Sequence, residues 1–452
     1  MKNLLPWLVA ALMIGSVVTE AATPENERVI NSFVQLVTGD DDYVDRAFAY
    51  LDDHWQPGFA AMALDVLSVA GASERSVRLW SMLEDKTQHA GGRSVSEWYQ
   101  WLWNRPETVH PAYGDFKSAL YALIDPAFRA YFSSDRKAEI RLDEIRWGGV
   151  RQDGIPPLRN PKMLRADEAD YLDDSNVVFG LEVNADARAY PKRILAWHEM
   201  FVDRVGGVDV AGVYCTLCGT MILYRTTYDG TKHDLGTSGF LYRSNKLMYD
   251  RATQSLWNTI WGTPVVGPLA GRGIELERGS VVTTTWAEWK RRHPDTQVLS
   301  LETGYDRDYS EGAAYRDYFA TDALMFGVPR LDTRLKNKDE VFVLRPDAGS
   351  EPPVAFASEF LTRNALYHDR VGAVDVVIVT DHSGAHRAYV AGDTRFEEWD
   401  GSTSLVDADG ERWSLEESRL YTADGRVKAR YPAHRAFWFG WYSAYPNTRL
   451  VR

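Results

Sequence analysis

The sequence predicts an α+β protein in which an N-terminal helical arm precedes an internally duplicated β-rich domain. Three observations predict this: apolar residues at helical spacing in the first third, short β-type runs separated by Gly and Asp turns in the rest, and blocks that recur in order within those runs. The expected segments are a signal peptide at 1–22, a helical domain at 24–146, a linker at 147–164, a first copy at 165–300, a connector at 301–329 and a second copy at 330–452.

Composition and charge limit the class of partner. The chain has 452 residues, of which 45% are hydrophobic and 25% charged, as in ordinary globular proteins. Its formal net charge is −13 at pH 7. Nucleic acids and anionic membranes attract basic surfaces. We therefore expect a small molecule or another protein as the partner, and no nucleic acid.

The N-terminus predicts export. Lys2 supplies a positive charge, residues 4–18 are almost entirely apolar, and residues 19–21 end in a small residue suited to cleavage. This layout is typical of a secretory signal, and the run is short of the roughly 20 residues of a membrane span. An uncleaved anchor is the alternative. We expect a periplasmic or secreted protein that has no membrane span after cleavage.

The helical arm is predicted from apolar spacing. Val29, Phe33 and Leu36 fall at i, i+4 and i+7, which lines one face of a helix, and five similar stretches follow. Ser94 stands three residues before Glu97 and predicts the start of one of these helices. Consecutive helix pairs of this length resemble a HEAT-like solenoid.

The β-rich region repeats itself. Four blocks recur in the same order: 178–181 as 341–344, 203–210 as 369–376, 250–253 as 400–403, and 286–296 as 438–448. We interpret them as two copies of one unit, packed as a pseudo-symmetric pair. Because Asp250 and Thr253 have counterparts in the second copy, a structural role such as an Asx turn is expected for them.

Features that both copies keep are most simply scaffold, so residues found in one copy alone are candidates for function. The first copy has four reactive residues: His198, Glu199, Cys215 and Cys218. The aligned residues of the second copy are, in the same order, Asn364, Ala365, Thr380 and Ser383. Drift after duplication is the alternative explanation. This asymmetry points to a catalytic site built from the four.

Cys215 and Cys218 are the two cysteines of the chain, and they follow a β-type run. In an oxidising compartment such a pair bonds to itself, holds a metal or reacts. The imidazole of His198, on a short helix predicted over 194–202, could complete a copper or zinc site with both thiolates or act as a base. Glu199 could take a proton, although adjacent helical residues point about 100° apart. A dithiol couple without metal stays open.

Polar residues downstream are candidate walls of the same site, where a substrate would bind: Ser238, Asn245 and Arg251. The motifs at 198–199, 214–220, 238–241, 248–257 and 437–441 resemble a bacterial and archaeal family catalogued as domain of unknown function 3179. The resemblance covers about residues 160–450 and leaves out the arm. It implies a shared domain and carries almost no mechanism.

Two classes of function therefore remain. The first is an exported oxidoreductase with a metal-thiolate or dithiol site, slightly in favour of the metal because bare dithiols are more usual on thioredoxin-like units. The second is a non-catalytic binding or scaffold protein whose arm presents a concave face and whose cysteines form a structural disulfide. A hydrolase using Ser238 and His198 lacks the Gly-x-Ser-x-Gly context.

Overall fold

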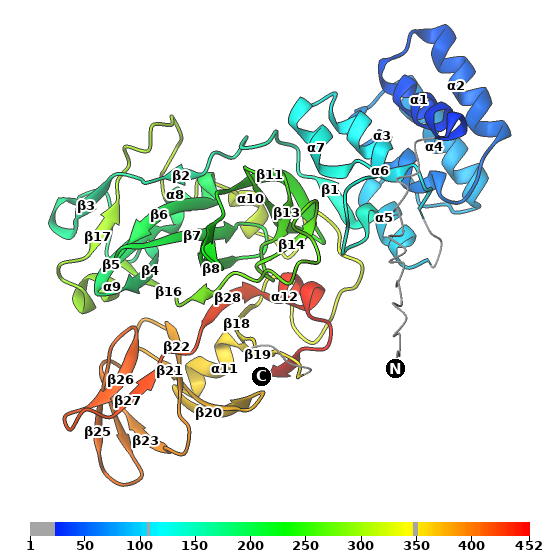
Figure 1. Cartoon of the computed structure of the whole chain (residues 1–452). Coiled ribbons are helices and arrows are strands. Elements are labelled where there is room, and N and C mark those ends of the chain that lie inside the picture. The colour runs from blue at the N-terminus through cyan, green and yellow to red at the C-terminus, as the bar shows by residue number, and fades with distance from the viewer. Residues whose placement is uncertain (1–22, 106–108, 347–350) are drawn as a thin grey trace, which may run out of the picture.

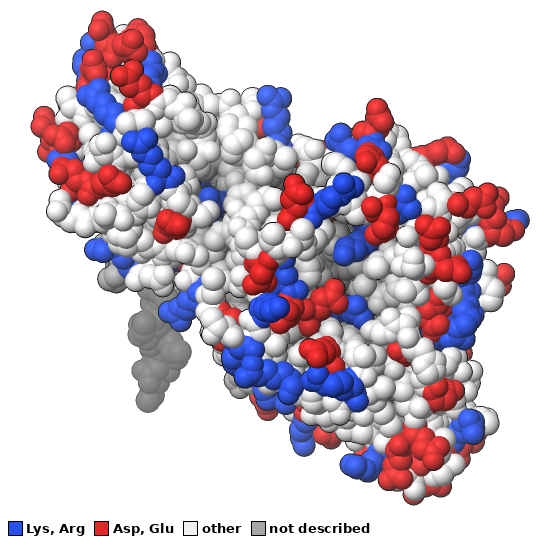
Figure 2. Space-filling view, turned by 180° about the vertical axis from the view of Figure 1, so that it is seen from behind, with Lys and Arg blue, Asp and Glu red and all other residues white. Residues whose placement is uncertain are grey.

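The computed structural model describes residues 23–105, 109–346 and 351–452. Helices dominate the N-terminal third and sheets the remainder, so the chain is an α+β protein, with the helical arm at one end (Figure 1). The predicted signal segment lies outside the described residues. Within those ranges, no helix is long and apolar enough to cross a membrane. Figure 2 shows acidic and basic side chains intermixed over one face.

The arm contains seven helices among its described residues: α1 (Pro24–Thr38), α2 (Asp41–Asp53), α3 (Phe59–Val69), α4 (Glu74–Thr87), α5 (Val95–Trp103), α6 (Tyr113–Tyr121) and α7 (Arg129–Phe132). Side-chain caps fix several of their starts. The Ser94 hydroxyl accepts a hydrogen bond from the Glu97 N–H at 3.4 Å, as the sequence predicted. Helix α3 contacts α1, α4, α5 and α6 and is buried from Phe59 to Leu67. The HEAT-like stacking stays a prediction.

A buried ion pair joins the arm to the β-rich domain. The side chains of Asp65 and Lys117 are both 0% exposed, and their charged atoms lie 2.9 Å apart. The Asp65 carboxylate also accepts three tyrosine hydroxyls at 2.6 to 2.9 Å, those of Tyr99, Tyr113 and Tyr121. The Lys117 ammonium donates to the carbonyl of Ile145 at 2.9 Å. Since Ile145 begins β1 (Ile145–Trp147), one polar network ties the arm's core to the first strand.

Three five-stranded sheets form the central part, together with a two-stranded one of β9 (Thr227–Tyr228) and β10 (Thr231–Lys232). The first has the order β1-β11-β12-β13-β14, with β11 (Leu235–Tyr242), β12 (Asn245–Asp250), β13 (Leu256–Asn258) and β14 (Thr263–Val266). The second is β15 (Arg278–Gly279), β8 (Thr220–Arg225), β7 (Val208–Cys215), β6 (Met200–Val205) and β2 (Leu158–Arg159). The third is β16 (Val282–Thr285), β4 (Val177–Val183), β5 (Asp186–Pro191), β17 (Gln297–Leu299) and β3 (Met163–Arg165).

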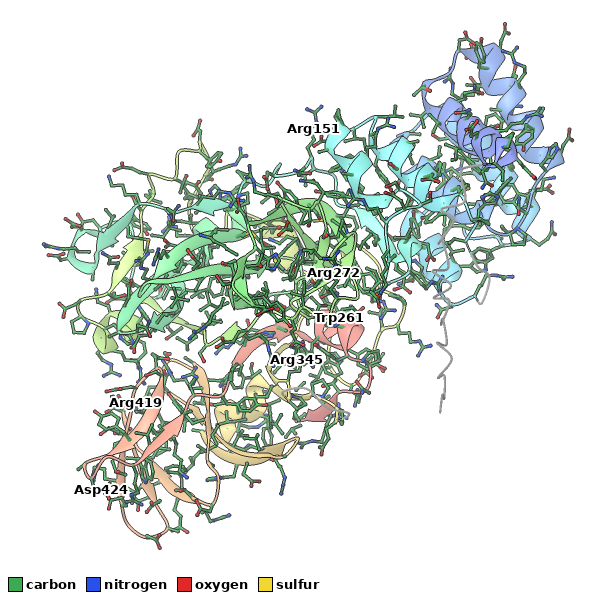
Figure 3. All side chains as sticks on the ribbon, viewed as in Figure 1. Arg151, Trp261, Arg272, Arg345, Arg419 and Asp424 are labelled. Atoms are coloured by element: carbon green, nitrogen blue, oxygen red, sulfur yellow. The ribbon has the colours of Figure 1, made fainter. Side chains whose placement is uncertain are left out.

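Three further sheets form the C-terminal part. One is β28 (Ala433–Phe437), β18 (Glu340–Leu344), β19 (Val354–Ala357) and β29 (Arg449–Val451). A meander follows, of β20 (Leu366–Val371), β21 (Val374–Thr380) and β22 (His386–Val390). The last is β23 (Phe396–Trp399), β24 (Ser404–Asp407), β25 (Arg412–Leu415), β26 (Arg419–Thr422) and β27 (Val427–Ala429). Arg345 donates to the carbonyl of Trp261 at 3.2 Å and joins this part to the central one (Figure 3).

The central and C-terminal parts share an arrangement. The runs β16-β4-β5-β17 and β28-β18-β19-β29 both have two antiparallel pairings followed by a parallel one. In each run the first strand leads into a helix, α9 (Trp286–Arg292) or α12 (Trp438–Ala444). The predicted Asx turn is present in both parts, because the carboxylates of Asp250 and Asp400 each accept backbone N–H groups two and three residues onward.

The helix predicted over 194–202 is shorter than expected. Helix α8 (Lys192–His198) ends at His198, and residues 200–205 form strand β6 instead. Glu199 lies between them with a left-handed φ of 54°, and its N–H closes the last helical turn on the Leu195 carbonyl. The prediction was wrong here because pairing with β7 outweighs the local helical pattern.

A long segment without sheet pairing crosses the central part. We call residues 300–339 the strap; all of them are described, and α10 (Arg316–Phe319) is its regular element. Side-chain hydrogen bonds hold it: the Tyr318 hydroxyl donates to the Leu217 carbonyl at 2.8 Å, and the Ser244 hydroxyl donates to the Phe326 carbonyl at 2.5 Å. Met325 and Leu331 of the strap are 51% and 47% exposed.

Candidate thiol site

The two cysteines lie where β7 turns into β8. Cys215 is the last residue of β7, and the Cys218 N–H donates to its carbonyl at 3.1 Å. Gly219 completes the turn at a φ of 58°, a left-handed conformation that favours glycine. Both thiols are free, and the residues are 1% and 0% exposed. The turn therefore holds two reduced sulfurs inside the protein.

The hairpin between β11 and β12 reaches the Cys218 sulfur. Arg243 and Ser244 form its tip, both with left-handed φ values. The Cys218 thiol donates to the Ser244 carbonyl at 3.3 Å, and the Asn245 side-chain amide donates to the Cys218 sulfur at 3.4 Å. Two buried atoms of this site have no hydrogen-bond partner among the described residues, the Thr216 hydroxyl and the Asn245 amide oxygen.

A buried ion pair lies against the thiols. The Lys246 ammonium donates to the Glu199 backbone carbonyl at 2.7 Å and lies 3.4 Å from its carboxylate. The side chains of Lys246 and Glu199 are only 5% and 8% exposed. The Tyr315 hydroxyl, from the strap, donates to the Glu199 carboxylate at 3.3 Å. Buried charges are costly in free energy, so such a pair next to reactive sulfurs indicates a functional site.

The surroundings shift the pKa values of the two thiols in opposite directions. Burial and the Glu199 carboxylate raise the pKa of Cys215, but hydrogen bonding by Cys218, the Lys246 backbone N–H and the Lys246 ammonium outweigh them and lower that pKa below the ordinary value. Burial raises the pKa of Cys218 well above the ordinary value, and its hydrogen bond to Cys215 adds to the rise. Cys215 is therefore the thiol that ionises first, with Cys218 as the proton donor beside it.

A small cavity adjoins the site. Its volume is about 60 Å³, and its polar wall contains Glu199, Lys246 and Tyr315. The remaining wall is mainly apolar and includes Leu217 and Phe326. A cavity of this size exceeds the roughly 10–15 Å³ that one water needs. Neither sulfur lines it; it reaches the residues that surround them.

His198 faces away from this wall. Its Nδ1 lies 2.9 Å from the Pro156 carbonyl and its Nε2 lies 2.5 Å from the Tyr309 hydroxyl. A carbonyl can only accept, so Nδ1 carries the proton and Nε2 accepts from the tyrosine. Burial lowers the pKa of His198, consistent with a neutral ring. Both nitrogens are thus occupied away from the sulfurs.

The structure does not gather the predicted metal ligands Cys215, Cys218 and His198 into one centre. Among the described residues, no group of three or more His, Cys, Asp or Glu side chains is arranged to hold a metal. The end of helix α8 explains the separation. Because Glu199 is left-handed, the carboxylate turns toward Lys246 while the preceding imidazole faces Pro156 and Tyr309.

Of the three predicted wall residues, Asn245 alone contacts a thiol. Ser238 is buried between β11 and β12, where its hydroxyl donates to the Leu247 carbonyl at 2.6 Å and accepts the Phe240 N–H at 3.0 Å. Arg251 is 47% exposed and lies 3.6 Å from each of two carboxylates, those of Asp153 and Asp234. Ser238 therefore shapes the strand, and Arg251 belongs to a surface ion-pair group.

Two site residues were not predicted, Lys246 and Tyr315. A lysine followed by Leu247 and Met248 in a β-type run was the available signal for Lys246, because charged residues are rarely buried unless paired. Tyr315 gave no such signal, since it reaches Glu199 from the strap, across 116 residues of sequence.

Replacing His198 by asparagine, the residue at the aligned position of the second copy, tests the imidazole directly. We expect the pH midpoint of Cys215 alkylation to stay unchanged, because the ring contacts Pro156 and Tyr309 instead of a thiol. The measurement is the rate of iodoacetamide labelling, followed by mass spectrometry. A clear shift of the midpoint would restore His198 to the thiol site.

The fold and the site define an α+β protein with a buried thiol pair in a β-rich domain. A family model described as "Protein of unknown function (DUF3179)" matches residues 152–448, from just after the arm to the last turn of the chain. The chain belongs to this family. Neither a curated protein nor a solved structure matches it.

Proposed function

We propose that the protein is an oxidoreductase whose thiol pair cycles between dithiol and disulfide, with Cys215 as the nucleophile and Cys218 as the resolving thiol. One observation carries the proposal: a buried ammonium–carboxylate pair, Lys246 and Glu199, lies against two free buried thiols. A purely structural disulfide needs no such charges, which are costly to bury.

The reaction is thiol–disulfide exchange with a small organic disulfide. The Cys215 thiolate attacks one substrate sulfur, so a Cys215–substrate disulfide forms and the substrate S–S bond breaks, releasing one thiolate. Cys218 then attacks the Cys215 sulfur. The internal disulfide forms, the second substrate sulfur leaves, and the Cys218 proton passes to a departing thiolate. Two electrons move from the protein to the substrate.

The remaining residues have supporting roles in this scheme. Lys246 stabilises the thiolate of Cys215, and Asn245 orients the Cys218 sulfur. The shared strand order of the central and C-terminal parts supports an origin by duplication, with the second copy as a scaffold that lost or never had the thiols. For the cycle to close, a second thiol compound must reduce the internal disulfide by the same exchange reaction, returning two electrons to Cys215 and Cys218.

Selective alkylation of the two cysteines tests the assignment. At neutral pH we expect Cys215 to label at least about tenfold faster than Cys218, because a thiolate is the reactive species and their acidities are shifted in opposite directions. The Cys218→Ser variant should keep the fast labelling, and Cys215→Ser should lose it. Equal rates in the wild type, or fast labelling that survives in Cys215→Ser, would contradict the assignment.

The same preparations separate the proposal from its rivals. Equilibration in glutathione buffers, read as the labelled fraction, should give a reversible two-electron couple in the wild type and none in either serine variant. Elemental analysis should find no stoichiometric copper or zinc. A metal present in the wild type and lost in Cys215→Ser would favour a metal-thiolate centre, and a disulfide that never reduces in the folded protein would favour a binding or scaffold protein.

A further inference from the structure

The central and C-terminal parts cover each other's turns. The Phe437 N–H, at the end of β28, donates to the carbonyl of Cys218 at 2.7 Å. In the reverse direction, Thr284 of β16 lies 3.0 Å from the Ser383 hydroxyl, which occupies the position aligned with Cys218. Each turn is therefore covered by the strand–helix unit of the other part. The thiol turn is completed by residues of the second copy.

Gly440 of that unit lies against the Cys218 side chain. A Cβ at Gly440 would have its three nearest neighbours in Cys218: Cβ at 3.0 Å, Sγ at 3.2 Å and Cα at 3.6 Å. In the first copy the aligned residue of α9 is Glu288, which pairs with Arg292 at 2.6 Å. A side chain is thus accommodated at this helical position in one copy, whereas the other leaves it empty against a thiol.

The glycine has no conformational reason to be there. Gly440 lies inside α12 and its φ is not positive. Glycine in a helix is less stable than alanine by roughly 0.5–1 kcal/mol. The space that it leaves for Cys218 is therefore the property that distinguishes it from alanine at this position.

We propose that Gly440 is a positioning residue for the thiol pair: helix α12 of the second copy fixes where the Cys218 sulfur lies relative to Cys215. The inference rests on the proposed function for its importance, but it concerns the geometry alone. The second copy would then be part of the site instead of a passive scaffold.

The effect works through the hydrogen bond that the Cys218 thiol donates. The Cys218 thiol donates to the Ser244 carbonyl at 3.3 Å, and the same thiol is one of the groups that lower the pKa of Cys215. A displacement of the Cys218 sulfur by less than an ångström changes how well its S–H can donate to Cys215, because a hydrogen bond weakens as it becomes longer or less well aligned. Weaker donation raises the pH at which Cys215 ionises.

The test uses the full-length Gly440→Ala variant. The rate of iodoacetamide labelling of Cys215 is measured across pH, and we expect its midpoint to rise so that labelling below the midpoint slows about threefold to tenfold. The matched control is Ser443→Ala, in the same helix and also buried. We expect the control to keep the wild-type midpoint. In urea denaturation, Gly440→Ala should unfold at a lower midpoint than the wild type only by the cost of its close contact with Cys218.

An unchanged labelling midpoint in folded Gly440→Ala would overturn the proposal. If that variant does not fold, Phe437→Leu replaces it, since the Phe437 ring packs where a Cβ of Gly219 would lie, at 2.9 Å. A shift of the midpoint is expected, because this variant loosens the contact between the second copy and the thiol turn, and an unchanged midpoint again overturns the proposal. A wild type without a reversible dithiol couple would remove the proposed function, whereas the comparison of labelling midpoints would still decide the role of Gly440.

Discussion

Replacing Asp65 by alanine is expected to lower the free energy of unfolding by about 3–5 kcal/mol, the usual loss when one partner of a buried ion pair is removed. The reason is that Lys117, 0% exposed, would keep its charge in the core without a counter-charge. Three tyrosine hydroxyls would lose their acceptor as well. The measurement is urea denaturation of the full chain, followed by far-ultraviolet circular dichroism.

Two further variants serve as controls, one for the loss of the buried charge and one for the loss of an aspartate side chain elsewhere in the arm. Asp65→Asn keeps an acceptor for the tyrosines and removes the charge, so its loss should be smaller than that of alanine. Asp45→Ala breaks an exposed pair with Arg78, whose side chains are 70% and 49% exposed, and should change stability little. If Asp65→Ala were no less stable than Asp45→Ala, the network would not hold the arm together.

Replacing Lys246 by methionine is expected to slow the alkylation of Cys215 at neutral pH about tenfold, the effect of roughly one pKa unit. The ammonium is one of the groups that lower the pKa of Cys215, and methionine keeps the apolar stem without the charge. The variant should also be less stable, because the Glu199 carboxylate would be left buried and unpaired.

The direction of the pH dependence follows from the sign of the shift. Because the folded-state pKa of Cys215 lies below the ordinary thiol value, labelling of the wild type should reach its midpoint below about pH 8.5, and that of Lys246→Met at higher pH. The thiolate of Cys215 likewise adds stability above its unfolded-state pKa, and this stability is lost as the pH falls through the folded-state pKa.

The double variant Lys246→Met with Glu199→Gln separates the two effects. Removing the unpaired carboxylate should restore much of the stability, since no charge then stays buried alone. The labelling midpoint should fall back from that of Lys246→Met, because the Glu199 carboxylate, which raises the pKa of Cys215, is removed together with the ammonium. A midpoint that never moves in either variant would show that Lys246 does not act on Cys215.

Local patterns predicted the regular elements well. The run at 177–183 is strand β4 with the same bounds, and the helix starting after Ser94 begins at Val95. Both signals are local, since alternation and capping act within one element. The end of α8 was missed because a single left-handed residue, Glu199, separates helix from strand, and no neighbour in the sequence marks it.

The site was predicted in part. Comparing the two predicted copies singled out both cysteines and Glu199, and the polar cluster downstream indicated Asn245. The comparison also singled out His198, whose direction depends on how the helix ends and on a tyrosine of the strap. Of the other contributors, Tyr315 reaches Glu199 across 116 residues of sequence, and Gly440 reaches Cys218 from still farther along the chain. Such long-range contacts leave no periodic trace in one sequence.

The strap would control how a reagent reaches the two sulfurs. Residues 300–339 lack sheet pairing and are held by scattered bonds such as Tyr318 to the Leu217 carbonyl. Segments of this kind open locally far more readily than paired strands unfold. With both sulfurs enclosed, the proposed exchange reaction would depend on brief detachment of this crossing segment. The thiols would then be exposed to solvent only intermittently. Bulky oxidants would be excluded by the short lifetime of the open state as much as by their size.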